Sequence, residues 1–155
     1  SQALLAFATS ILLILFVGLI RFLIGDYQLP QHWTIAAAQA NPKAEPIAPL
    51  ALSGMISNAG TLSGLAAGGI WLYQKGWMDA RGELWKRLLR FLIGVIGVFI
   101  LWFGLGEVFP RGEALLPYTL RYLRYALVGF WISGLAPWLF MRMKIAEAVK
   151  QQKIK

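Results

Sequence analysis

The chain has 155 residues, is 58% hydrophobic and only 14% charged, and carries a net charge of +8. A chain this short and this apolar cannot cover its hydrophobic surface within one water-soluble core, so the composition favours an integral membrane protein. The absence of cysteine excludes disulfides, thiolate metal sites and cysteine nucleophiles, and the basic residues gather beside apolar segments rather than in a nucleic-acid motif.

Four apolar segments are long enough to cross a bilayer, for which about 20 residues suffice. The sequence therefore predicts an all-α fold, a single-domain integral membrane bundle of about four transmembrane helices, at residues 3–25, 49–73, 88–109 and 118–141. Between the first two lies an interfacial loop, residues 26–48, in which Thr34 to Ala40 are predicted to form a short surface helix.

The second segment is organised around glycine. Gly60, Gly64 and Gly68 recur every four residues and so lie on one face of a helix. In a membrane, small residues let two backbones approach each other and gain van der Waals contact. We expect this groove to pack against a partner in the bilayer, and Gly129 and Ser133 to form a second small-residue contact in the fourth segment.

Basic residues predict the orientation. A loop at 74–87 and a tail at 142–155 are rich in Lys and Arg, whereas the other two connections have only Lys43 and Arg111. By the positive-inside rule, both rich regions and both termini lie in the cytoplasm, beside what we expect to be a bacterial inner membrane. The residues expected to contact lipid headgroups are Lys75, Arg81, Lys86, Arg87, Arg90, Arg142 and Lys144.

Two features stand out in the last two segments. Glu107 ends the third and Arg121 and Arg124 lie near the start of the fourth, so we predict an interfacial charge pair that offsets the desolvation of its members. The alternatives are an unpaired interfacial charge and part of a ligand site. Pro137 predicts a kink in the fourth helix.

Little in the chain indicates catalysis. His32 is the only histidine and lies in a loop, so neither a two-histidine site nor a haem or chlorophyll ligand inside the bundle is expected. Asp79 and Glu83 are predicted to form surface ion pairs with Arg81, Lys86 or Arg87. No metal and no cofactor is expected.

The second half of the chain nevertheless resembles a known family. The stretches that carry the resemblance are Gly82–Phe91, Gly104–Glu113, Leu120–Trp131 and Ala136–Phe140. They are similar to the C-terminal membrane region of bacterial type 2 phosphatidic acid phosphatase-like proteins, of the lipid phosphatase and haloperoxidase superfamily. That family's chemistry uses two histidines and an aspartate, with Lys and Arg holding the phosphate. Its Arg-Pro and Pro-Ser-Gly-His motifs do not occur in this sequence, so the resemblance transfers no catalytic residue.

These observations predict a non-catalytic accessory module that packs against a partner in the bilayer. Membrane lipids and other membrane protein subunits, such as those of a photosynthetic or respiratory complex, are the expected partners, and nucleic acid is not. The first alternative is the C-terminal part of a longer lipid-phosphate phosphatase whose catalytic half precedes this region. The second is a small transporter-like protein, for which Ser57 and Asn58 are the only strongly polar candidates at mid-span.

Overall fold

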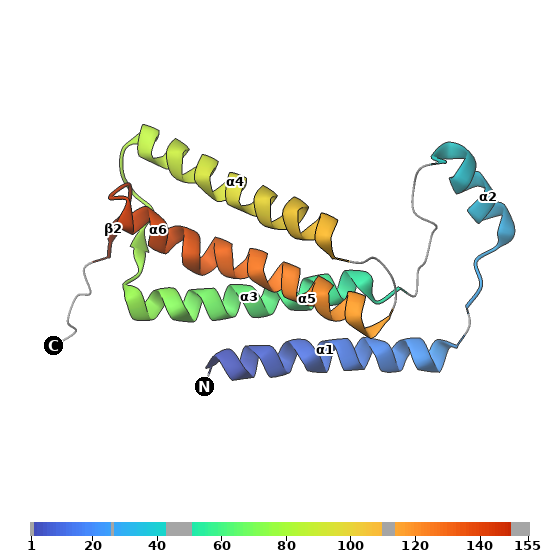
Figure 1. Ribbon diagram of the computed structural model, residues 1–155. Coiled ribbons are helices and arrows are strands. Elements are labelled where there is room, and N and C mark those ends of the chain that lie inside the picture. Colours follow the sequence, from blue (N-terminus) through green and yellow to red (C-terminus); the bar gives the residue numbers. More distant parts are fainter. Residues whose placement is uncertain (1, 26, 43–50, 110–113, 150–155) are drawn as a thin grey trace.

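The computed structural model describes residues 2–25, 27–42, 51–109 and 114–149, and this part of the chain is almost entirely helical (Figure 1). The helices are α1 (Gln2–Ile24), α2 (Gln31–Ala40), α3 (Ser53–Lys75), α4 (Leu84–Val108) and a last continuous helix formed by α5 (Leu115–Phe130), η1 (Trp131–Leu135) and α6 (Ala136–Arg142). Two short strands, β1 (Met78–Asp79) and β2 (Glu147–Ala148), complete it. The predicted all-α membrane fold is confirmed. Lys43, Arg111 and the tail beyond Val149 lie outside the described residues.

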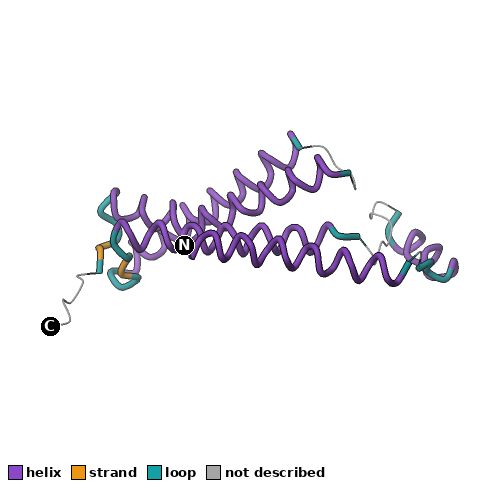
Figure 2. The backbone as a smooth tube through the Cα atoms, turned by 90° about the horizontal axis from the view of Figure 1, so that it is seen from below, coloured by secondary structure: helices purple, strands orange, loops and turns teal. Residues whose placement is uncertain are grey.

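The long helices run back and forth along one overall direction (Figures 1 and 2). α3 is the centre of the bundle, because it packs against α1 on one side and against α5 and η1 on another. α4 packs against α5, η1 and α6. The α3–α4 connection and β2 lie at one end, and α2 lies beyond the other (Figure 1). The short surface helix expected between the first two segments is therefore present as α2.

In the described part of the chain, three helical stretches are long and apolar enough to cross a membrane: Leu4–Ile24, Leu84–Val108 and Leu115–Arg142. α3 has the length, 23 residues, but it is not among them, since glycine and serine take the place of large apolar side chains. Its surroundings explain the composition: Ile56, Ala59 and Leu72 are among its buried residues, so other helices rather than lipid cover much of this helix. The fourth crossing stays a prediction.

The basic connection and the start of the tail differ from their predicted form. α3 continues to Lys75 and α4 begins at Leu84, so the predicted loop 74–87 is confined to residues 76–83. The chain after Arg142 does not extend freely from the bundle. β2 pairs antiparallel with β1, with Ala148 opposite Met78 and Glu147 opposite Asp79.

Pro137 changes the type of helix rather than breaking it. Ahead of it, Trp131–Leu135 form a π-helical turn, in which the Ala136 N–H donates to the Trp131 carbonyl five residues earlier. Because proline has no N–H and its ring excludes the carbonyl four residues earlier, an α-helical pattern would be strained here. The wider turn accommodates the ring where the sequence predicted a kink.

A tight turn ends α6. The Lys144 N–H donates to the Met141 carbonyl at 3.1 Å, and the Ile145 N–H donates to the Phe140 carbonyl at 3.0 Å. This is the hydrogen-bond pattern of a Schellman motif, and the side chains of Ile145 and Phe140 meet in the buried cluster that also contains Ala146. Lys144 holds the left-handed position, with a φ of 58°, where glycine is usual.

Lys144→Gly is therefore expected to raise the free energy of unfolding by about 0.5–1 kcal/mol, because the left-handed conformation no longer strains a Cβ. The measurement is thermal unfolding of the detergent-solubilised protein. Lys144→Ala is the matched control, since it removes the same charge and keeps the Cβ. A Gly variant no more stable than the Ala variant would contradict the turn geometry.

Candidate functional site

The glycine face of α3 is filled by the chain's own last helix. A Cβ added at Gly60 would overlap the carbonyl oxygen of Tyr122, and one at Gly64 would overlap that of Ala126. A Cβ at Gly68 would overlap the Ser133 hydroxyl of η1 and would also lie close to the backbone of Gly134. At Gly60 and Gly64 the backbones of the two helices touch, with no side chain between them.

The small residues of the last helix complete the contact. A Cβ at Gly129 would lie 2.6 Å from the Thr61 carbonyl oxygen, and the Ser133 hydroxyl donates to the Leu65 carbonyl of α3 at 2.9 Å. The groove expected to take up a partner is thus occupied from within. The chain returns through α5 and η1, and Gly129 and Ser133 thereby pack against the glycine face of α3. This packing leaves no room there for another helix.

Trp131 of η1 makes a close contact with α4. The Trp131 indole N–H donates to the Gly94 carbonyl at 3.0 Å, and a Cβ at Gly97 would overlap the indole ring. Two glycines three residues apart in α4 therefore form the recess that holds Trp131. These glycines and Trp131 lie far apart in the sequence, and only the fold brings them together.

A cluster of three hydroxyls joins α1, α3 and α5. The Ser63 hydroxyl donates to Ser10 at 2.7 Å, and the Tyr122 hydroxyl lies 2.6 Å from Ser63 and 2.8 Å from Ser10. Ser10 is fully buried and also donates to the Phe7 carbonyl at 2.7 Å. Because polar groups in an apolar setting are costly unless satisfied, this cluster selects the position at which α1 docks. This cluster was not predicted from the sequence, although Ser10 inside the apolar first segment was the available signal.

Removing one member should measure the strength of this cluster. Ser63→Ala is expected to lower the free energy of unfolding by about 1 kcal/mol, since two hydroxyls each lose a partner. Tyr118→Phe is the control, because the Tyr118 hydroxyl is buried without a partner among the described residues and its removal should be neutral or stabilising. Denaturant titration in mixed micelles compares the two, and equal losses would refute the assignment.

The charge pair predicted near the α4–α5 connection does not form. Within the described part of the chain, Glu107 makes no ion pair with Arg121 or Arg124 and is exposed. Arg124 instead lies against Gly106, whose Cβ position would be 2.9 Å from its Nη1, and its guanidinium is 5.0 Å from the centre of the Tyr125 ring. The helical phase of α4 is the reason, since it turns Gly106 rather than Glu107 toward this guanidinium.

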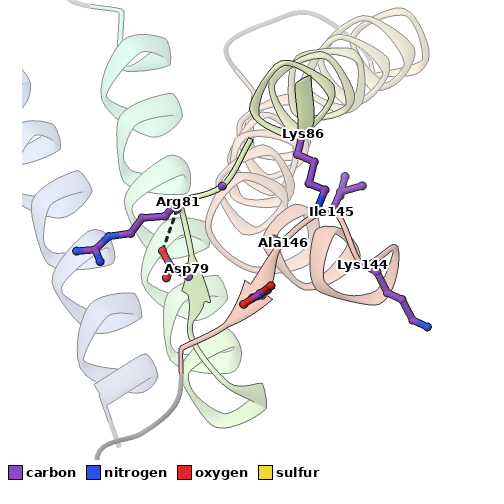
Figure 3. Close-up of a pocket in the computed structure, with 8 residues that line it drawn as sticks. Asp79, Arg81, Lys86, Lys144, Ile145 and Ala146 are labelled. Atoms are coloured by element: carbon purple, nitrogen blue, oxygen red, sulfur yellow. Dashed lines mark hydrogen bonds between the residues drawn. The ribbon is translucent and has the colours of Figure 1, made fainter. Parts of the chain in front are cut away.

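The basic residues at the other end surround a pocket of about 160 Å³ (Figure 3). Lys86 points toward Ile145, whereas Arg81 and Lys144 point away from it (Figure 3). The pocket is lined by Asp79, Arg81, Gly82, Lys86, Lys144, Ile145, Ala146 and Glu147. Lys75, Arg87 and Arg142 are exposed at the same end, outside this lining, and the Arg142 guanidinium lies 5.2 Å from the centre of a Trp138 ring.

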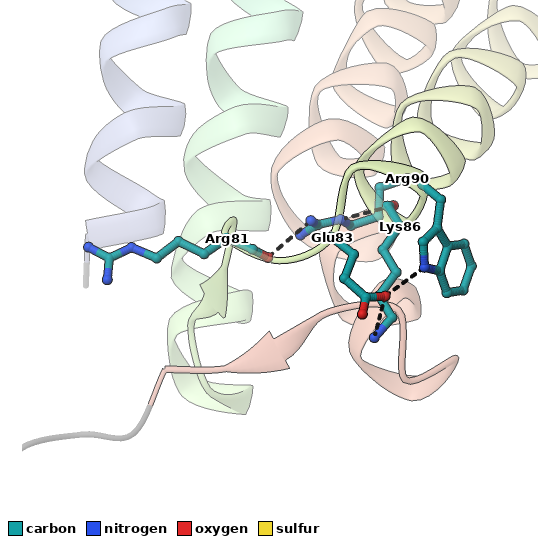
Figure 4. Close-up of polar contacts among 5 residues, drawn as sticks. Arg81, Glu83, Lys86 and Arg90 are labelled. Carbon is teal, nitrogen blue, oxygen red and sulfur yellow. Dashed lines mark hydrogen bonds and ion pairs between the residues drawn. The ribbon is translucent and has the colours of Figure 1, made fainter.

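Arg90 is not a surface cation. It is 6% exposed, and its guanidinium donates to the carbonyls of Asp79 and Ala80 at 3.2 and 3.1 Å. It also donates to the carbonyls of Arg81 at 3.2 Å and Lys86 at 3.3 Å (Figure 4). The headgroup contact predicted for Arg90 is therefore wrong. The fork of donors instead holds the basic connection against the start of α4, a geometry that the planar guanidinium suits and an ammonium does not.

The acidic residues of this end have separate roles. Glu83 pairs with Lys86 at 3.6 Å and accepts the Trp85 indole N–H at 2.6 Å (Figure 4). Asp79 accepts the backbone N–H of Arg81 at 2.8 Å rather than its guanidinium. Of the two acids expected to form surface ion pairs with these cations, only Glu83 does so in the described structure.

One protein-family model matches this chain. The model of the PAP2 superfamily phosphatase, transmembrane extension, matches residues 56–148, more than half of the chain. The chain belongs to this family. The resemblance to a PAP2-like membrane region is thereby confirmed, and the chain is an integral membrane protein. Neither a curated protein nor a solved structure matches it.

The PAP2 transmembrane extension covers most of the structure described above. The match begins on the buried face of α3, includes α4 and the whole last helix, and ends at the β1–β2 pair. The glycine contact, the Trp131 recess, the Arg90 connection and the charged pocket all lie inside it. α1 and α2 precede it, so the hydroxyl cluster attaches a helix from outside the matched region to the extension.

Among the described residues, no three His, Cys, Asp or Glu side chains come together as a metal site would require. His32 is exposed on α2, with its ring 5.9 Å from that of Trp33.

Proposed function

We propose that this chain is a non-catalytic membrane module that supports a PAP2-type lipid phosphatase within the bilayer. The observation that carries the proposal is the match of residues 56–148 to the transmembrane extension of that superfamily. The sequence supports it from the chemical side: His32 is its only histidine, and the family's reaction uses two. In the alternative form of the proposal, the module and the catalytic half belong to one longer polypeptide.

The glycine face of α3 is occupied by the chain's own last helix, so lipids and partners contact the outer faces of the bundle. Large apolar side chains such as Phe22 of α1 and Phe91 and Phe103 of α4 are more than half exposed. In a bilayer these faces contact acyl chains or the helices of a partner. A partner therefore packs against the outside of the bundle, not into the groove of Gly60, Gly64 and Gly68.

The same proposal includes an orientation. The α3–α4 connection and the end of α6 lie together at one end of the bundle (Figure 1), and this end carries Lys75, Arg87, Arg142 and Lys144. The positive-inside rule places this end and both termini in the cytoplasm, among anionic headgroups of a bacterial inner membrane.

Two experiments test the catalytic and the partner parts of the proposal. The purified chain in lipid nanodiscs is expected to release no phosphate from phosphatidic acid, and release that is lost in His32→Ala would overturn the non-catalytic assignment. After solubilisation in mild detergent, a PAP2-type phosphatase is expected to copurify or to be part of the same polypeptide. Copurification with a photosynthetic or respiratory complex instead would contradict the assignment of the partner.

A further inference from the structure

The pocket at the basic end carries charges of both signs. Lys86 lines one side and points toward Ile145 (Figure 3). Asp79 and Glu147 contribute carboxylates to the lining. A set of cations alone would suit any anion, and a set of carboxylates any cation. The mixture instead suits a small group that is itself zwitterionic.

The two carboxylates are held in a costly arrangement. Asp79 and Glu147 lie directly opposite each other in the β1–β2 pair. Like charges at opposite positions of an antiparallel pair destabilise it. Asp79 accepts one backbone N–H, and Glu147 has no partner within the described part of the chain. A cation with several donors between the two carboxylates would remove this repulsion.

The walls of the pocket are preorganised. Arg90 holds the carbonyls of residues 79–81 from behind, and the Schellman turn and the strand pairing fix the other side. The cavity of about 160 Å³ corresponds to roughly five water molecules, which matches a polar headgroup rather than an acyl chain. Ligand binding here orders few additional groups, which favours affinity.

The position of the pocket indicates where its ligand comes from. Trp77 within the connection and Trp85 at the start of α4 are 50% and 57% exposed. Tryptophan at the ends of membrane helices lies at the level of the headgroups. A group of this size at this depth belongs to a lipid rather than to a solute in the aqueous phase.

We propose that this pocket binds the headgroup of a phospholipid with a primary ammonium group, of the phosphatidylethanolamine type. The ammonium lies between Asp79 and Glu147, and the phosphate faces Lys86. A primary ammonium has three donors for the two carboxylates, whereas a choline headgroup has none and a glycerol headgroup has no charge to offer them. The inference rests on the proposed location of this end among headgroups.

The test is a lipid competition on the purified full chain in detergent. Equal amounts of phosphatidylethanolamine, phosphatidylcholine and phosphatidylglycerol are offered, and native mass spectrometry measures which lipid is retained. Phosphatidylethanolamine is expected to be preferred by about tenfold, as one charge-assisted hydrogen bond implies. Glu147→Gln is expected to abolish this preference, and Lys86→Gln to reduce its retention.

Arg87→Gln is the matched control, because it removes a positive charge from the residue next to Lys86 without touching the pocket. Equal retention of phosphatidylglycerol by the native chain, or an equal loss in Arg87→Gln and Lys86→Gln, would overturn the pocket and leave only a general basic surface. Competition by soluble phosphoethanolamine at equal concentration would overturn the lipid as the source. The orientation is tested separately, by protease access to the basic end in sealed vesicles, so its failure is distinguishable.

Discussion

Gly64→Ala is expected to lower the free energy of unfolding by about 2–4 kcal/mol, since the new methyl group would overlap the Ala126 carbonyl and force α3 away from α5. The two helices touch through their backbones at this point, so no flexible side chain can yield. The loss of stability includes neighbouring contacts, because moving α3 away from α5 also separates Gly60 and Gly68 from the residues they touch. Denaturant titration of the solubilised protein measures the change.

Gly69→Ala is the control for this prediction. Gly69 follows Gly68 in the same helix, but a Cβ there meets nothing within 4 Å. The substitution is therefore expected to be neutral or to stabilise by up to about 1 kcal/mol, as alanine does in a helix. If both variants lost the same stability, the close contact at Gly64 would not be the cause of the loss.

Arg90→Leu is expected to have the second large effect, a loss of about 2–4 kcal/mol in the free energy of unfolding. The variant leaves three loop carbonyls, those of residues 79–81, without their charged donor. Arg90→Lys is expected to recover only part of the loss, because a single ammonium cannot reach all three. The connection should also become more accessible, so trypsin should cleave after Arg81 faster than in the native chain.

Arg87→Leu serves as the comparison for Arg90→Leu. Arg87 is exposed on the same helix, and its replacement is expected to change stability by less than about 0.5 kcal/mol. Should the two variants lose equal stability, or should trypsin cleave both at the native rate, Arg90 would be one more surface cation, as its sequence position suggested.

The difference between Arg90 and its neighbours illustrates the limit of charge patterns. In the sequence, Lys86, Arg87 and Arg90 are alike: basic residues at the start of an apolar helix. Their separation depends on helical phase and on where the chain returns, because Arg90 faces the connection that folds over it and Arg87 faces outward. Glu107 shows the same limit, since one position along α4 determines that Gly106 faces Arg124.

The sequence by itself determined that this protein lies in a membrane and where most of its helices are. Runs of large apolar residues of membrane length specify helices whatever their neighbours are, because only lipid or other helices can cover them. The glycine spacing likewise determined which face of α3 makes a close contact, since a 3.6-residue period puts those positions on one side.

Tertiary structure alone decided what each of these surfaces meets. The partner of the glycine groove is α5 of the same chain, Ser10 finds Ser63 and Tyr122, and Asp79 comes to lie opposite Glu147. These contacts join residues far apart in the sequence. They depend on how whole helices are rotated and shifted relative to one another, which the packing of all the helices together determines. The sequence pattern of a single helix does not show this placement.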